Sequence, residues 1–120
     1  MNNAHGTSMI PNIYVYHKTR KRNRASILEN GLRVSIGDSY GHVSRKRNNE
    51  VIPAIFVNNT VGCNDGYSKE HDFDIFRINT TIIDNIWFID EYMEARNSKY
   101  LATFKDIPTH AIKLIHLGKY

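Results

Sequence analysis

The order of hydrophobic and polar positions predicts one helix early in the chain, placed directly after a strand. Residues 13–16 are β-branched or aromatic, a composition that favours a pleated strand. Residues from about 20 to 30 are mostly good helix formers, and Gly31 follows them at a position suited to ending a helix. The helix is expected to bury one apolar face made by Ala25, Ile27, Leu28 and Leu32. A strand, a polar turn and a helix are therefore expected in succession.

The rest of the chain alternates apolar runs with polar turns, which predicts further strands. Residues 33–50 are expected to form a loop that includes a short strand at 41–44. Strands are expected at residues 52–57, 73–78, 85–90, 100–104 and 111–117. One early helix followed by many strands indicates an α+β fold with a mostly antiparallel sheet.

The length of 120 residues suits a single domain. Residues 1–9 are expected to form a flexible N-terminal lead-in, so the domain is assigned to residues 10–120. The sequence has no apolar run of about 18 residues and no signal-peptide pattern. Its single cysteine, Cys63, cannot form an internal disulfide. We therefore expect a cytoplasmic protein that does not cross a membrane.

The net charge of +4 is distributed unevenly along the chain. Residues 18–24 contain five cations and no acid, and residues 45–47 add three more cations. Such clusters often contact phosphate groups, although a solvated face rich in Lys and Arg is an equally good explanation. The candidate ligands for a phosphate group or a nucleic acid are Arg20, Lys21, Arg22, Arg24, Arg45 and Arg47.

His17 and Thr19 occupy the junction between the predicted strand and helix. A rigid framework on both sides aims such side chains outward, as in many binding sites, but a histidine at the end of a strand is also often only structural. The surrounding motif favours binding. It reads Tyr16-His17-x-Thr19-x3-Asn23-x2-Ser26-Ile27-Leu28-Glu29-Asn30-Gly31-Leu32. This motif resembles the first motif of the ADP-ribosyltransferase superfamily, and is closest to that of the DarT-type DNA ADP-ribosyltransferases.

The resemblance implies a small ADP-ribosyltransferase-like fold with NAD as a substrate. In that superfamily the histidine of this motif hydrogen-bonds a ribose hydroxyl of NAD, and the backbone beside it receives the nicotinamide carboxamide. His17, Lys18 and Thr19 would correspond to this element, with the Lys18 side chain pointing away. The aromatic residue that stacks on nicotinamide would be Tyr67, for which a packing role is an equally good explanation.

The catalytic glutamate of the superfamily has no counterpart at its usual place. Members normally carry it at the start of the strand before an Ile-Pro turn, where it stabilises the positive charge that develops as nicotinamide leaves. In this sequence the corresponding residues are Ser98-Lys99-Tyr100. Candidate substitutes in the preceding segment are Glu94, Glu91 and Asp90, each of which could also be an ordinary solvated residue.

Two classes of function follow from these observations. The first is an enzyme that transfers ADP-ribose from NAD to a nucleic-acid or protein acceptor. The second is a degenerate module that binds nucleic acid, nucleotide or a protein without turnover. The missing glutamate favours the module, whereas the intact first motif favours the enzyme. Of the two, we expect the enzyme. A metal site has little support, because the six histidines lack the spacing of metal ligands.

Overall fold

Strand β2 (Tyr14–Thr19) lies inside the main sheet, with β5 on one side and β6 on the other. The computed structural model describes residues 8–34, 46–47, 50–51, 53–60, 72–89 and 99–119. In this part of the chain the main sheet has seven strands, in the order β1 (Ser8–Met9), β7 (Trp87–Ile89), β8 (Tyr100–Thr103), β5 (Ile55–Asn58), β2, β6 (Asp74–Asn79) and β9 (Ile112–His116). Every pairing between neighbouring strands is antiparallel.

The remaining elements are short. Strands β3 (Lys46–Arg47) and β4 (Glu50–Val51) pair only with each other. One α-helix, α1 (Arg24–Asn30), lies in the described part of the chain. Three-residue 3-10 turns occur at η1 (Lys21–Asn23), η3 (Thr80–Ile82) and η4 (Thr109–Ala111). The prediction of an α+β fold, with a mostly antiparallel sheet and one main early helix, is confirmed, and this helix is short.

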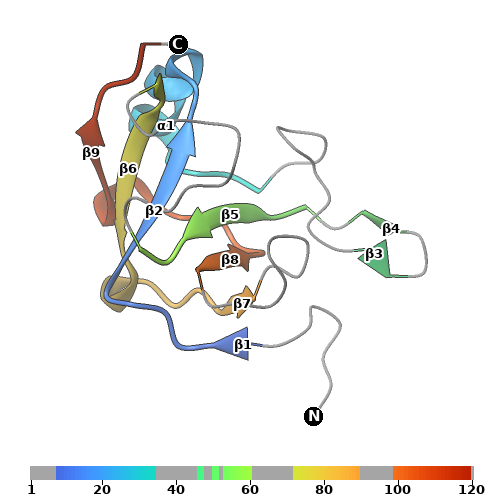
Figure 1. Cartoon of the computed structure of the whole chain (residues 1–120). Helices are drawn as coiled ribbons and strands as arrows, with labels where there is room; N and C mark the ends of the chain where they lie inside the picture. Colours follow the sequence, from blue (N-terminus) through green and yellow to red (C-terminus); the bar gives the residue numbers. More distant parts are fainter. Residues whose placement is uncertain are drawn as a thin grey trace.

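The main sheet consists of two parts that meet between β2 and β5. Strand β2 pairs with β6 along its whole length, from Tyr14 to Thr19, but pairs with β5 only through Tyr16 and Asn58. Figure 1 shows β2, β6 and β9 running steeply, whereas β5, β8 and β7 run across the view. The strands therefore separate on either side of a single residue pair, and the two parts turn away from each other.

A pair of asparagines ties the two parts together beside this junction. The backbone N–H of Asn12 donates to Oδ1 of Asn59 at 2.8 Å, and Nδ2 of Asn12 donates to the carbonyl of Asn59 at 2.9 Å. Asn59 is buried, and its own N–H donates to the carbonyl of Lys99 at 2.7 Å. Side-chain hydrogen bonds thus take over where the ladder between β2 and β5 is missing.

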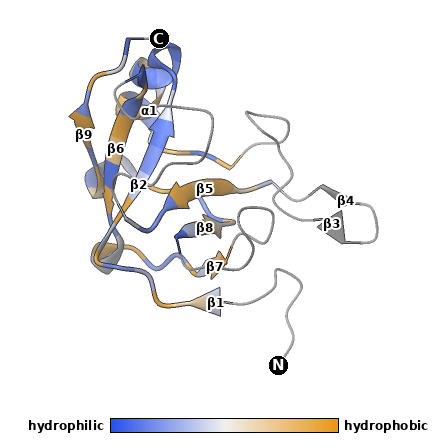
Figure 2. Ribbon diagram, in the orientation of Figure 1, coloured by the Kyte–Doolittle hydropathy of each residue, from blue (hydrophilic) through white to orange (hydrophobic). Residues whose placement is uncertain are grey.

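One hydrophobic core joins the inner faces of both parts of the sheet. The colouring of Figure 2 shows that β5 and β6 are largely hydrophobic. Helix α1 and the segment before β9 close the core, whose buried members are Val15, Ile27, Leu32, Ile55, Val57, Phe76, Ile78, Trp87, Leu101, Ile107 and Ala111. Since residues from both parts belong to one cluster, the sheet must curl around this core rather than lie flat.

Helix α1 buries less of its surface than its sequence pattern predicts. Ile27 is buried as expected, but Leu28 is 52% exposed and Ala25 is also exposed, so the prediction of a wide apolar face is wrong. The helix has only seven residues and ends at Asn30, so Leu32 lies beyond it and cannot extend an apolar helix face. Leu32 is buried through a different contact, a two-hydrogen-bond bridge to Ile107.

The N-terminal segment joins the sheet earlier than the predicted boundary at residue 10. Ser8 and Met9 form β1 and pair with Phe88 and Trp87 of β7. Residues 1–7 of the predicted lead-in, and the strand expected at 41–44, lie outside the described residues. No helix in the described ranges is long and apolar enough to span a membrane.

Gly31 gives a test of the way α1 is connected to the sheet. Its φ is +80°, and a Cβ at this position would lie 2.3 Å from the carbonyl oxygen of Ile107. Gly31→Ala should therefore lower the free energy of unfolding by about 1–3 kcal/mol, because it adds both backbone strain and a clash. Urea unfolding measures this, with Ser26→Ala on the exposed face of α1 as the control. Equal stability of the two variants would contradict the described contact.

Candidate functional site

His17 lies where β2 and β5 separate. The register places His17 one residue beyond the Tyr16–Asn58 pair, on the same face of β2 as the buried Val15. Its Nδ1 lies 2.8 Å from the carbonyl oxygen of Phe56 in β5, and the side chain is partly buried. The imidazole ring therefore bridges the two parts of the sheet beyond the last backbone pair.

The contact with Phe56 determines which ring nitrogen of His17 carries the proton. A carbonyl oxygen can only accept a hydrogen bond, so Nδ1 must donate. In the neutral ring, Nε2 is then a hydrogen-bond acceptor. A rigidly held imidazole with a defined acceptor atom is suited to receive a hydroxyl hydrogen, such as that of a ribose.

Thr19 is held by the turn that follows it. Its Oγ1 accepts a hydrogen bond of 2.8 Å from Nδ2 of Asn23, and the backbone N–H of Asn23 donates to the carbonyl of Arg20 at 3.0 Å. These two bonds fold η1 back against the end of β2. The same alternation that places His17 and Thr19 on the inner face places Lys18 on the outer face.

A buried ion pair anchors the start of α1 beneath this turn. Nε and Nη2 of Arg24 each donate to a carboxylate oxygen of Asp74 in β6, both at 2.8 Å. The Asp74 side chain is fully buried, and it also accepts a 2.8 Å hydrogen bond from the N–H of Gly118. Strand β6, helix α1 and the C-terminal segment are therefore joined through one carboxylate, and Asp74 itself pairs with Thr19 of β2 in the sheet.

The environment of Asp74 favours its charged form. The side-chain hydrogen bonds from Arg24 hold the pKa of the Asp74 carboxyl below its usual range. Burial opposes this shift, whereas the backbone hydrogen bond from Gly118 supports it. Asp74 is consequently a permanent anion at neutral pH, and it neutralises one member of the basic cluster.

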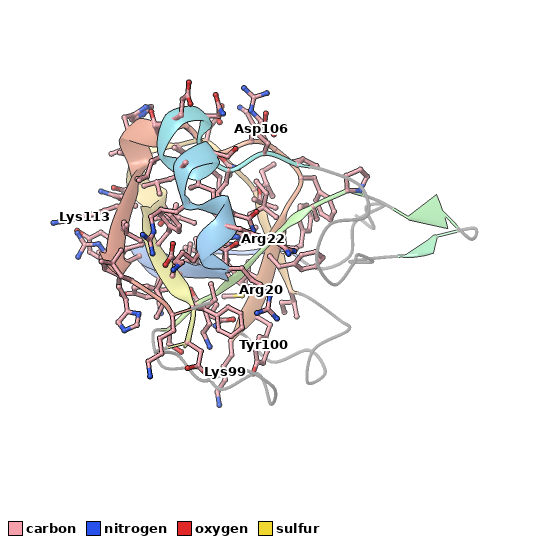
Figure 3. All side chains as sticks on the ribbon, turned by 90° about the horizontal axis from the view of Figure 1, so that it is seen from above. Arg20, Arg22, Lys99, Tyr100, Asp106 and Lys113 are labelled. Carbon is pink, nitrogen blue, oxygen red and sulfur yellow. The ribbon has the colours of Figure 1, made fainter. Side chains whose placement is uncertain are left out.

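The other cations of the cluster differ from Arg24 in their surroundings. Arg20, Lys21 and Arg22 are exposed on the turn, and Figure 3 shows Arg20 and Arg22 beside the start of the helix. The guanidinium carbon of Arg20 lies 5.1 Å from the ring centroid of Phe73, so a cation–π contact orients this side chain. These three residues remain candidates for phosphate binding, while the guanidinium of Arg24 is occupied by Asp74.

Several residues named from the sequence lie outside the described ranges. They are Arg45, Tyr67, Asp90, Glu91 and Glu94, and of Arg47 only the strand position in β3 is described. Strand β8, which begins at Tyr100, carries no acidic residue, and all four of its residues are buried. Among the described residues no three of His, Cys, Asp and Glu lie together as potential metal ligands.

The chain was also compared with known proteins. It matches no protein-family model and no curated protein.

Three contacts of the site escaped the sequence analysis. The Phe56 carbonyl is a backbone group, so no side-chain pattern could indicate it. Asn23 stands in the motif, four residues after Thr19, which is the one signal that could have predicted their hydrogen bond. Asp74 begins β6 and is buried, and a buried charge requires a cationic partner, but Arg24 lies 50 residues away in the sequence, which conceals this pairing.

The ion pair gives a pH-dependent prediction. Asp74→Asn should lower the free energy of unfolding by about 3 kcal/mol at pH 7. This value lies at the lower end of the range for breaking a buried ion pair, because the side chain of Arg24 is 28% exposed. The folded-state pKa of Asp74 lies below its unfolded value of about 3.9. Its contribution is therefore complete above that value and is lost as the pH falls through the folded-state pKa.

Urea unfolding over a pH series measures this effect. The difference in stability between wild type and Asp74→Asn should shrink below about pH 4. Asp84→Asn is the matched control, since the exposed Asp84 pairs with Lys105 in solvent and its loss should change the stability much less. A difference that stays constant down to acidic pH would show that the charge of Asp74 does not stabilise the fold.

Proposed function

We propose that this protein binds NAD at the end of β2 and transfers its ADP-ribose to a nucleic-acid or protein acceptor. The observation that carries the proposal is His17. The ring is held by the Phe56 carbonyl at the point where the sheet opens, with Nε2 as its acceptor. In the superfamily that the first motif resembles, the histidine of this motif holds a ribose of NAD, and that resemblance supports the proposal.

The ADP-ribosyltransferase-like fold is part of this proposal. It is supported by the order of strand, turn and short helix at the start of the domain, and by an antiparallel sheet that opens next to the motif. Thr19 and Asn23, both members of the motif, contact each other and shape the turn. The motif residues thus cooperate in one local structure.

The exposed cations supply a second element of the proposed site. Arg20, Lys21 and Arg22 lie within five residues of His17 and could engage the pyrophosphate of NAD or a nucleic-acid acceptor. Phe73 orients Arg20 through the cation–π contact. Tyr67 is proposed to stack on the nicotinamide ring.

The reaction breaks the bond between the nicotinamide nitrogen and C1′ of its ribose, and the acceptor atom forms the new bond to C1′. Nicotinamide leaves with the electron pair, so positive charge develops on the ribose and requires a nearby carboxylate. We assign this carboxylate to Glu94 or Glu91, with Asp90 as a further candidate. The acceptor loses its proton as the new bond forms.

One observation favours a second candidate function. Strand β8 carries no acid, and Lys99 stands at its start, where the superfamily would place its glutamate. A degenerate module that binds NAD, nucleic acid or a protein without turnover has no need of that glutamate. Binding and turnover must therefore be measured separately.

NAD binding tests the site before any acceptor is identified. His17→Ala should weaken binding by at least about tenfold in titration calorimetry, because the ribose loses a hydrogen-bond partner. His17→Asn is the sharper variant. Its amide can still donate to the Phe56 carbonyl, so the junction should remain intact, but it has no equivalent of Nε2. It should fold like the wild type and still lose NAD affinity by at least about tenfold.

His110→Ala is the matched control, because His110 is exposed in η4. It should bind NAD like the wild type. Wild-type affinity in both His17 variants, or no saturable NAD binding by the wild type, would overturn the proposed function.

The assigned acids are tested by turnover. Of the variants Glu94→Gln and Glu91→Gln, the one that removes the catalytic carboxylate should reduce nicotinamide release by about 10²–10³-fold. Its NAD affinity should be nearly unchanged, because the carboxylate acts on charge that develops only in the transition state. Single-turnover release of nicotinamide measures this. NAD binding without any release by the wild type would instead support the module.

A further inference from the structure

Four exposed isoleucines lie on two connections of the main sheet. One connection is residues 10–13, between β1 and β2, and the other is residues 80–86, between β6 and β7. Single apolar side chains are common on protein surfaces, but a group of them usually marks a contact with another molecule. The four residues, which we call the isoleucine patch, are Ile10 at 90% exposure, Ile13 at 60%, Ile82 at 49% and Ile86 at 62%.

The two connections are tied together at one end by the sheet itself. Met9 of β1 pairs with Trp87 of β7 in an antiparallel register. Ile10 and Ile86 each lie one residue beyond this pair, on the two connections that leave it. The register therefore brings these two isoleucines close together.

Hydrogen bonds tie the connections together at the other end. The backbone N–H of Thr80 donates to the carbonyl of Ile13 at 2.9 Å, and its Oγ1 donates to the carbonyl of Asn12 at 2.8 Å. Figure 1 shows the connection from β1 to β2 passing beside the turn at the end of β6. Since three residues span at most about 10 Å, both ends belong to one patch.

The core does not need the patch residues. Three of them have a neighbour in the chain that packs in or against the core, and these neighbours are Met9, Ile83 and Trp87. The isoleucines beside them add apolar surface that the fold leaves exposed. Only a second molecule can remove this surface from water.

Electrostatics favours a second copy of this chain as that molecule. The net charge of +4 makes two copies repel each other unless they meet through neutral surfaces. The two connections contain one charged residue, Asp84, and it forms an ion pair with Lys105. The patch with this ion pair therefore has no net charge, and two identical patches can meet without repulsion.

The exposed area is sufficient for a reversible dimer. The four isoleucines expose on the order of 500 Å² in each copy. Two copies that pack through them would bury about 1,000 Å², which is the lower limit for a specific interface. A two-fold axis places the same patch on both sides of such a contact.

We propose that this protein forms a reversible two-fold dimer in which the isoleucine patches of two copies pack against each other. Ile13 precedes β2, whereas His17 lies four residues further along, about 13 Å away. The contact therefore does not use the residues proposed to hold NAD. The proposal goes beyond ADP-ribose transfer and does not rest on it.

Sedimentation velocity of the full chain between about 1 and 200 µM tests this dimer. The wild type should change from monomer to dimer as its concentration rises. Ile10→Asp and Ile86→Asp should each weaken dimerisation at least about tenfold, because the interface would enclose an unpaired carboxylate. Leu117→Asp is the matched control, since Leu117 is 61% exposed outside the patch, and it should dimerise like the wild type.

Thermal unfolding verifies that each variant is folded, and Ile10→Ser replaces Ile10→Asp if the charged variant unfolds. Raising the salt from about 50 to 500 mM should not weaken the dimer, because the patch is neutral. Loss of the dimer at high salt would contradict an apolar contact.

Other outcomes would overturn the proposal. A wild type that stays monomeric up to about 200 µM would exclude the dimer. Loss in Leu117→Asp that equals or exceeds the loss in Ile86→Asp would place the contact elsewhere. A monomeric wild type that binds phosphatidylcholine vesicles, and loses this binding in Ile10→Asp, would assign the patch to a lipid surface. The result is separate from the proposed function, since His17→Ala should dimerise like the wild type.

Discussion

The structure depends on the incomplete joint between β2 and β5. Only Tyr16 and Asn58 pair across it, so most backbone contact between the two parts of the sheet is absent. Side chains replace it on both sides, through Asn12 with Asn59 at one end and His17 with the Phe56 carbonyl at the other. Such an opening leaves polar backbone groups that need hydrogen-bond partners other than the neighbouring strand.

The buried ion pair has a complementary function. An open joint is a weak part of a sheet, and the turn beside it must be held by other means. Arg24 and Asp74 attach the start of α1 to β6, and Gly118 brings the C-terminal segment to the same carboxylate. A Cβ on Gly118 would lie 2.4 Å from the carbonyl carbon of Phe73, so the close backbone approach requires glycine at this position.

Strand β2 separates two kinds of chemistry by simple alternation. Its inner face carries His17 and Thr19, which are restrained by Phe56 and Asn23. Its outer face carries Tyr14, Tyr16 and Lys18, and Tyr14 contacts Arg77 of β6. A single strand can thus contribute to a proposed nucleotide site on one face and make unrelated contacts on the other, because successive side chains point to opposite sides of the sheet.

Local properties of the sequence determined much of the fold. The β-branched and aromatic runs correctly indicated β2, β5, β6, β7, β8 and β9, and Gly31 marked the end of α1, because strand preference and positive φ are properties of a few adjacent residues. The motif from Tyr16 to Leu32 indicated His17 and Thr19 as candidate binding residues, and their role stays a prediction. The exposure of Leu28 was not predictable, because the spacing of apolar residues does not indicate which of them pack against the sheet when the helix is short.

Contacts between distant parts of the chain were decided by the tertiary structure alone. The partner of His17 is a carbonyl 39 residues away, and the partner of Arg24 is a carboxylate 50 residues away. The sequence placed Arg24 in a basic cluster with Arg20 and Arg22, but only folding separates a paired guanidinium from exposed ones. The charge of each residue and the spacing of residues can be read from the sequence. The burial of a side chain and its hydrogen-bond or ion-pair partner are determined only when distant strands pack together.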